Sequence, residues 1–147
     1  MGTIIRAEIS KNNPYYISKN RYYELKYFCL QYKEFKQRYN ELCNYIKSNW
    51  LIKIEDNPDY FKQDSMNHVR EQYLNKIKVI EDCAKNLDPV LGAYIFIGVT
   101  NGVTYNYLKM NKNIPCCKDT YYKLYRKFFW MLDDMVWYLK VIYEQEI

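Results

Sequence analysis

Apolar side chains recur every three or four residues along most of this chain, which is the spacing that places them on one face of an α-helix. The longest such stretch runs from Ser18 to Asn49. Its apolar positions are Leu25, Phe28, Tyr32, Phe35, Tyr39, Leu42, Cys43 and Ile46. The pattern predicts one long N-terminal helix, capped by Ser18 and preceded by an arm of 17 residues in which Asn12, Asn13 and Pro14 break any element. A helix of this length favours pairing, either with the rest of its own chain or with a second copy as a coiled coil.

The middle of the chain predicts a loop and a second helix. The loop runs from Asn49 to Gln63, with a turn at Asn57-Pro58-Asp59. Three apolar residues in it fit either a short strand or a segment docked on the core: Leu51, Ile52 and Ile54. The second helix is predicted from about Ser65 to Lys85, with one apolar face made of Val69, Tyr73, Ile77, Ile80 and Ala84.

Three further helices are predicted after residue 87. Asp88 and Pro89 suit the start of a short, strongly apolar helix that Asn101-Gly102 ends. Thr104 caps another short helix through about Met110, and the stretch from Asn111 to Pro115 breaks it. A last helix begins near Cys117 or Lys118 and continues past Leu132.

These elements predict an all-α fold with a long N-terminal helix and a tri-helical C-terminal unit whose last helix is extended. The expected division places the arm, long helix and loop in residues 1–64 and a helical domain in residues 65–147. Within that domain, residues 88–132 match the plan of a helix-turn-helix. In that plan the second helix of the pair enters the DNA major groove by its N-terminal end.

The charge of the last helix changes sign along its length. The segment from Lys112 to Lys127 carries five cations and one acid, whereas the chain after Trp130 carries four acids and one lysine. Lys and Arg bind phosphates, and short polar side chains at a helix start read base edges. The candidate DNA-binding residues are Lys112, Lys118, Thr120, Lys123, Arg126 and Lys127. The other interpretation is an ordinary amphipathic helix whose basic face meets solvent.

Composition narrows the class of protein only slightly. Of the 147 residues 49% are apolar and 27% are charged, as in a folded globular protein, and 18 are tyrosines. The net charge of +5 permits binding to nucleic acid or to an acidic protein. No apolar run is long enough to span a bilayer, and the first ten residues lack a signal-peptide core. We therefore expect a cytoplasmic protein without membrane contact.

Side chains that could carry catalysis are sparse. The chain has one histidine, His68, and five cysteines without a C-x-x-C pair, which argues against a zinc site and a disulfide framework. The neighbours Cys116 and Cys117 leave a redox or metal-sensing role open. Phosphate-binding loops and hydrolase motifs are missing from the sequence. The sequence predicts a protein that is not an enzyme and that uses no cofactor and no metal.

Three segments carry a resemblance to a known family. They are RYYELKYFCLQYKEFKQRYNEL (21–42), KIKVIEDCAKNLDPVLGAYIFIGVTNGVTYNYL (76–108) and IPCCKDTYYKLYRKFFWML (114–132). The chain resembles the small late-gene transcriptional regulators of phages and prophages of low-GC Gram-positive bacteria, the RinA-like and ArpU-like proteins. That resemblance implies a helix-turn-helix similar to region four of sigma factors, a phage protein acting in a host cell, and duplex DNA as partner. It places Lys118, Thr120, Lys123, Arg126 and Lys127 on the recognition helix.

The sequence departs from this family in its apolar loop and in its tail, MVWYLKVIYEQEI (135–147). The apolar tail favours a homodimer or a protein partner such as a host RNA polymerase or a defence complex. The leading hypothesis is a DNA-binding transcriptional regulator. The first alternative is an inhibitor of a host defence nuclease, similar to an anti-CRISPR protein, that acts by protein contact or in a nucleic-acid groove. The second alternative is a small terminase-like DNA adaptor.

Overall fold

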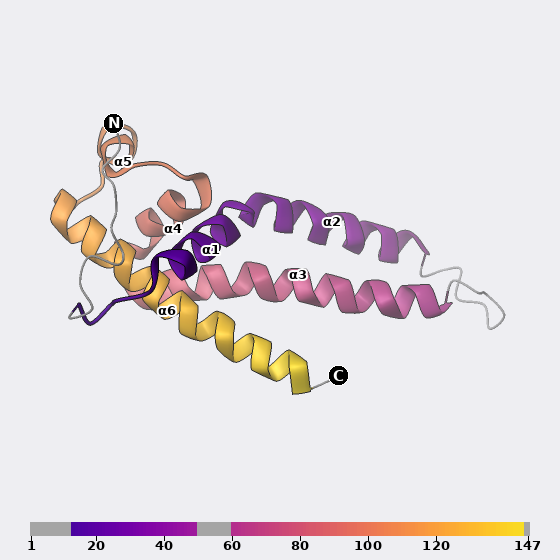
Figure 1. The fold of residues 1–147 in the computed structure, drawn as a ribbon. Coiled ribbons are helices and arrows are strands. Elements are labelled where there is room, and N and C mark those ends of the chain that lie inside the picture. Colours follow the sequence, from indigo (N-terminus) through magenta and orange to yellow (C-terminus); the bar gives the residue numbers. More distant parts are fainter. Residues whose placement is uncertain (1–12, 50–59, 146–147) are drawn as a thin grey trace. The chain divides into compact units, whose positions relative to one another are not determined.

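The structure is a computed structural model that describes residues 13–49 and 60–145, with side chains over 13–47 and 65–139. Its helices are α1 (Lys19–Leu30), α2 (Tyr32–Asn49), α3 (Tyr60–Leu87), α4 (Gly92–Asn101), α5 (Tyr105–Lys112) and α6 (Lys118–Gln145) (Figure 1). The described residues form no strand, so the predicted all-α class is confirmed. None of the described helices has the length and apolarity needed to cross a bilayer.

The chain divides into two compact units, and the first is discontinuous in sequence. Unit 1 comprises residues 1–31 and 79–147, and unit 2 comprises residues 32–78. α3 runs without interruption through the boundary expected near residue 64 and contributes its last turns to unit 1.

The long N-terminal helix expected from the apolar pattern is divided into α1 and α2 at Gln31. Ser18 caps α1 as predicted, because its hydroxyl oxygen accepts a hydrogen bond of 3.3 Å from the backbone N–H of Arg21. At Gln31 the backbone N–H bonds to the carbonyl of Phe28, three residues back, at 3.2 Å. This tighter bond ends α1, and α2 begins at the next residue, Tyr32, a local change that apolar spacing does not reveal.

α3 extends beyond its predicted range at both ends. It begins at Tyr60 rather than Ser65, so the last part of the expected loop is helical, and it ends at Leu87. The segment with Leu51, Ile52 and Ile54 lies outside the described residues. Strong helix formers such as Lys62 and Gln63 continue the helical ladder toward the N-terminus although the apolar spacing is weak there.

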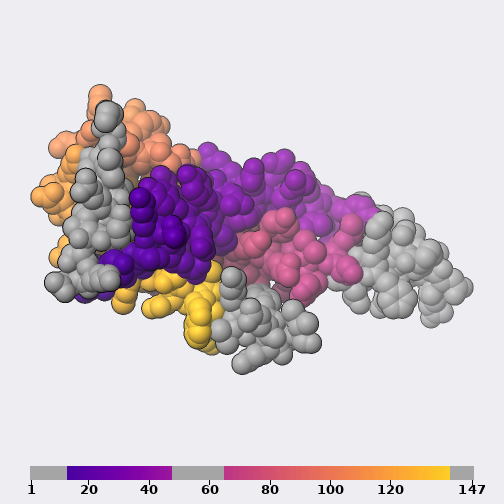
Figure 2. Space-filling model, viewed as in Figure 1, coloured from indigo at the N-terminus to yellow at the C-terminus, as the bar shows by residue number. Residues whose placement is uncertain are grey.

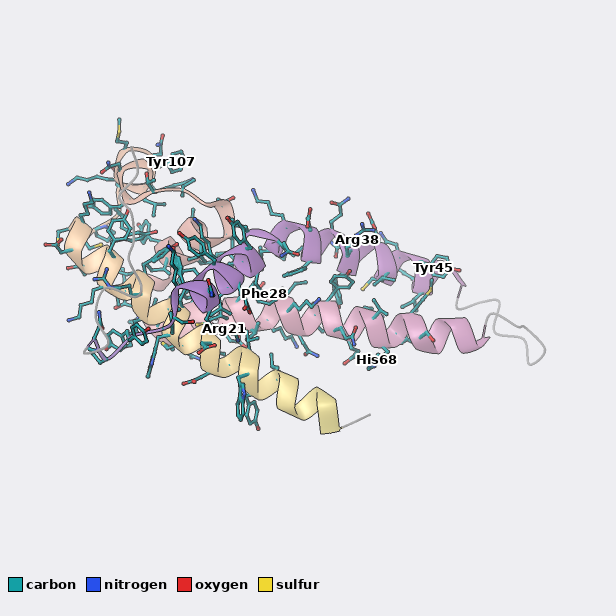
Figure 3. All side chains as sticks on the ribbon, in the orientation of Figure 1. Arg21, Phe28, Arg38, Tyr45, His68 and Tyr107 are labelled. Carbon is teal, nitrogen blue, oxygen red and sulfur yellow. The ribbon has the colours of Figure 1, made fainter. Side chains whose placement is uncertain are left out.

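The core of unit 1 forms where α1, the end of α3, α4 and α6 pack together. Its most deeply buried side chains are Leu25, Cys29, Ile80, Cys83, Ile95, Leu108, Tyr121, Phe128, Phe129 and Leu132. α1 is joined to α6 by a hydrogen bond of 2.9 Å between the Tyr22 and Tyr125 hydroxyls, and by the ion pair of Arg21 with Asp133. Arg21 lies where the two helices pass one another (Figure 3), and their side chains form a continuous surface (Figure 2).

The entry into α4 is built on Asp88 and Gly92. The Asp88 carboxylate accepts hydrogen bonds from the backbone N–H groups of Leu91 and Val90 at 2.7 and 2.9 Å, which lowers the pKa of that carboxyl. Asp88 therefore caps the turn it was predicted to cap, while the α-helix itself starts at Gly92. Gly92 is buried directly against the carbonyl of Ala84 in α3.

Unit 2 consists of α2 and most of α3, which lie side by side (Figure 1). The Phe35 and Tyr73 rings pack with centroids 6.2 Å apart, and the Lys76 amino group lies 5.3 Å from each centroid. Tyr45 on α2 and His68 on α3 belong to the same unit (Figure 3). The faces predicted for these helices are buried only in part: Phe35 and Ile77 are buried, whereas Val69, predicted on the same face as Ile77, is 39% exposed.

Candidate nucleic-acid interface

α5 begins as predicted and ends slightly later than predicted. The Thr104 hydroxyl accepts a hydrogen bond of 3.2 Å from the backbone N–H of Tyr107, so Thr104 is the expected N-cap. The helix continues through Lys112, because Asn113 is the residue that adopts the left-handed conformation, with φ 52°. Its N–H and that of Ile114 both bond to the carbonyl of Leu108, which closes the helix end.

A turn of five residues, 113–117, connects α5 to α6. Two contacts fix this turn against α5: the Ile114 side chain is buried, and the Tyr105 hydroxyl donates a hydrogen bond of 2.6 Å to the carbonyl of Cys116. The ring of Tyr105 also packs on Tyr121 in the second turn of the following helix, at 5.7 Å between centroids. α5, the turn and the start of α6 are therefore held together by direct contacts.

The structure separates the six predicted DNA-binding residues into two groups. Four of them are exposed: Lys112, Lys118, Thr120 and Lys123. The other two, Arg126 and Lys127, are half-buried. The exposed residues belong to the last turn of α5 and the first two turns of α6, so the open cationic surface is shorter than the sequence suggested.

Tyr15 explains why the second group is less open. Its ring lies 5.8 Å from the Lys127 amino group and makes an edge contact with the Trp130 ring at 5.5 Å between centroids. The segment that precedes α1 thus lies on the outward face of α6 at its third and fourth turns. Sequence reasoning missed this contact, because Tyr15 lies in the short segment before α1, which carries no periodic signal.

The opposite face of α6 is buried, as the spacing of its apolar residues predicted. Tyr121, Tyr125 and Phe128 are each less than a tenth exposed, and Leu132 is completely buried. Burial of this face in unit 1 determines which side chains of the first two turns point outward. The outward set includes one acid, Asp119, which lies four residues before Lys123 and therefore on the same side of the helix.

Two neighbouring cysteines precede α6 in different environments. Cys117 is exposed, and its sulfur accepts hydrogen bonds from the hydroxyl and backbone N–H of Thr120, which lower the pKa of the thiol. Cys116 is half-buried, and burial raises the pKa of its thiol. Burial also raises the pKa of Cys83 to about 12. Cys117 therefore combines an exposed position with a lowered thiol pKa, which favours the reactive thiolate over Cys116 and Cys83 at neutral pH.

We expect iodoacetamide to modify Cys117 before the other described cysteines. Because a lowered pKa puts more thiolate at a given pH, its alkylation rate should rise at lower pH than that of Cys116. Peptide mass spectrometry over a pH series measures both rates in one sample. The substitution Thr120→Val removes the hydroxyl bond and should shift the Cys117 profile to higher pH. An unshifted profile would contradict the assigned cause.

The acidic end of α6 is only partly covered. Asp133 pairs with Arg21 of α1, as a tail packed on the N-terminal helix would require, but Trp137 and Tyr138 are 64% and 63% exposed. Val136 and Leu139, which flank them, are half-buried. The end of α6 is thus joined to α1 through Asp133, whereas the large aromatic side chains Trp137 and Tyr138 are exposed.

His68 is exposed on α3 and lies 3.3 Å from the Gln72 amide. In the part of the chain that the structure describes, no three His, Cys, Asp or Glu side chains gather as a metal site would require. Comparison of the chain with protein-family models, with curated proteins and with solved structures gave no match.

Proposed function

We propose that the protein binds duplex DNA as a helix-turn-helix regulator, with α5 and α6 as the helix pair. The observation that carries this proposal is the arrangement of the first two turns of α6, where Lys118, Thr120 and Lys123 are exposed while Tyr121 and Tyr125 hold the helix to the core. The DNA major groove is wide enough for the N-terminal end of one helix. The buried side of that helix must be fixed to the rest of the domain so that the exposed side chains keep their positions.

The side chains at this end suit distinct parts of the duplex. Lys118 and Lys123 provide charge for phosphate oxygens, and Lys112 adds a third cation at the end of α5. Thr120 is short and polar enough to approach a base edge. The Asp119 carboxylate would repel a phosphate, but in the DNA major groove a carboxylate can accept a hydrogen bond from the amino group of cytosine.

The positions of Arg126 and Lys127 assign them a lesser part in binding. Both side chains are half-buried, and that of Lys127 lies beside the Tyr15 ring, so they are less free to reach phosphate than Lys118. In this proposal they add positive potential behind the contact surface. A terminase-like adaptor would also bind duplex DNA, so it shares this expectation with the regulator. A nuclease inhibitor would instead bind a protein, and a DNA-binding measurement distinguishes it from the other two.

Binding to a fluorescent duplex of mixed sequence, measured by anisotropy over a salt series, tests the proposal. Phosphate contacts release counterions, so we expect Lys118→Ala and Lys123→Ala each to weaken binding and to reduce the salt slope by about one. Lys33→Ala removes the same charge from an exposed position on α2 and should leave the slope unchanged.

Two results would overturn the interface. One is the absence of salt-dependent binding to the duplex by the wild-type protein, which would favour a protein partner. The other is a salt slope for Lys118→Ala and Lys123→Ala equal to that of Lys33→Ala. Protection of Cys117 from iodoacetamide by bound duplex provides an independent check, because this thiol lies one residue before α6.

A further inference from the structure

Unit 1 contains an open pocket of about 270 Å³ between α1, the turn from α4 to α5, and the first half of α6. Its volume lies just below the range of roughly 300–1,000 Å³ that is usual for sites of drug-sized ligands. Tyrosines from two helices supply half of the residues that line it, and the others are Lys26, Gly98, Gly102, Val103 and Thr104. The pocket lies on the side of α6 that faces the core, away from Thr120 and Lys123.

One wall of the pocket holds a polar group without a partner. The Tyr121 side chain is 1% exposed, and its hydroxyl makes no hydrogen bond to any described residue. This hydroxyl lies over Gly98, where a Cβ would overlap it. Leaving a buried hydroxyl unpaired costs stability, so a small movement of the wall that opens this enclosed hydroxyl to the pocket would let a bound molecule pair with it. Burial raises the pKa of the Tyr121 phenol, which keeps the hydroxyl protonated as a donor.

The pocket has one positively charged side chain in its described lining, that of Lys26. None of the described residues that line it carries a carboxylate. The Lys26 amino group lies 5.8 Å from the centroid of the Tyr23 ring, at the α1 side of the pocket. A cation in a pocket whose described lining has no carboxylate favours an anionic ligand and disfavours the ammonium ligands that aromatic cages bind.

The tyrosine rings select the shape of the ligand. Tyr121, Tyr122 and Tyr125 contact one another edge to face or tilted, with centroids 5.0 to 6.1 Å apart, so their faces and edges both reach the lining. The Tyr22 hydroxyl bonds to that of Tyr125, which fixes the back of the pocket. Planar rings pack well against such a wall.

We propose that this pocket binds a small aromatic carboxylate, with the carboxylate at Lys26, the ring among the tyrosines and a polar substituent at the Tyr121 hydroxyl. This site goes beyond the proposed function, because it lies on a different face of α6 and is tested without DNA. Its walls include Val103 and Thr104 before α5 and Tyr121 in α6, so an occupied pocket would tie α1 to both helices of the candidate interface.

Titration calorimetry with 4-hydroxybenzoate tests this site, and 4-hydroxybenzamide is the neutral probe of the same shape. We expect saturable binding of the acid at millimolar concentration or below, and binding at least tenfold weaker for the amide. Lys26→Met should weaken binding of the acid by a similar factor and should no longer distinguish the two probes. Lys33→Met, outside the pocket, should bind as the wild type does.

Tyr121→Phe supplies the second arm of the test. It should weaken binding of the acid about tenfold through loss of one hydrogen bond, while the unfolding midpoint stays equal or rises because an unpaired buried hydroxyl is removed. Weaker binding in this variant is then not a consequence of unfolding. Two results would overturn the proposal: no saturable binding by the wild type, which means that the pocket holds solvent only, or discrimination between acid and amide that persists in Lys26→Met.

Discussion

Phe128→Ala is expected to destabilise unit 1 by about 3–5 kcal/mol, the usual cost of truncating a fully buried aromatic ring. Phe128 has no exposed surface, and its ring makes an edge contact with Phe129 at 5.2 Å between centroids. The carbonyl of Phe128 also accepts a hydrogen bond from the Cys83 thiol of α3 at 3.4 Å. The ring therefore fills space where two helices meet, and alanine would leave a cavity there.

Urea unfolding followed by far-ultraviolet circular dichroism measures this loss. Trp137→Ala is the matched control, because it removes a larger aromatic side chain from the same helix at a position that is 64% exposed. A surface truncation of this kind is expected to change stability by less than about 0.5 kcal/mol. If the two variants were equally stable, the assignment of Phe128 to the core and of Trp137 to the surface would be wrong.

Gly92→Ala should destabilise the protein by about 1–3 kcal/mol, although alanine is the better helix former. A Cβ at residue 92 would overlap the backbone carbonyl oxygen of Ala84, which no side-chain rotation can move. Gly92 opens α4, so helix propensity alone predicts that alanine stabilises by up to about 1 kcal/mol. The two effects have opposite signs, and the sign of the measured change shows whether α3 and α4 approach this closely.

Thermal and urea unfolding of Gly92→Ala and Ala93→Ser make this comparison. Ala93 is the next residue of α4 and is exposed, so serine there should change stability by only a few tenths of a kcal/mol. A Gly92→Ala protein that is more stable than the wild type would refute the contact with Ala84. If Ala93→Ser lowered the free energy of unfolding as much as Gly92→Ala does, any substitution at the start of α4 would be destabilising. The effect of Gly92→Ala would then not be due to the contact with Ala84.

Local rules predicted the helix ends well, where a single residue decides the conformation. Ser18 and Thr104 cap helices as expected, and Gly102 ends α4 with φ 68°. Each of these residues acts within four positions of itself, so the sequence contains the whole cause. The apolar face of α6 was predicted for the same reason, since its spacing depends only on helix geometry.

Features that depend on distant residues could not be predicted in this way. The break between α1 and α2 at Gln31 lies inside a continuous apolar pattern, and the cover that Tyr15 provides for Lys127 joins residues more than a hundred positions apart. The tyrosine pocket also needs side chains from both ends of the chain, among them Tyr22 and Tyr125. Apolar spacing assigns each residue to a face, but it does not identify the partner of that face.

The contacts between α1 and α6 have a consequence for the order in which the protein folds during synthesis. The Tyr22–Tyr125 hydrogen bond spans 103 positions and the Arg21–Asp133 ion pair spans 112. α1 is therefore made early, and its contacts with α6 form only after that helix has left the ribosome, later than its contacts with α4 can form. Contacts of such long range slow folding, because chain entropy is lost before they form. Until then the apolar face of α1, with Leu25 and Cys29, is open to chaperones and to other nascent chains.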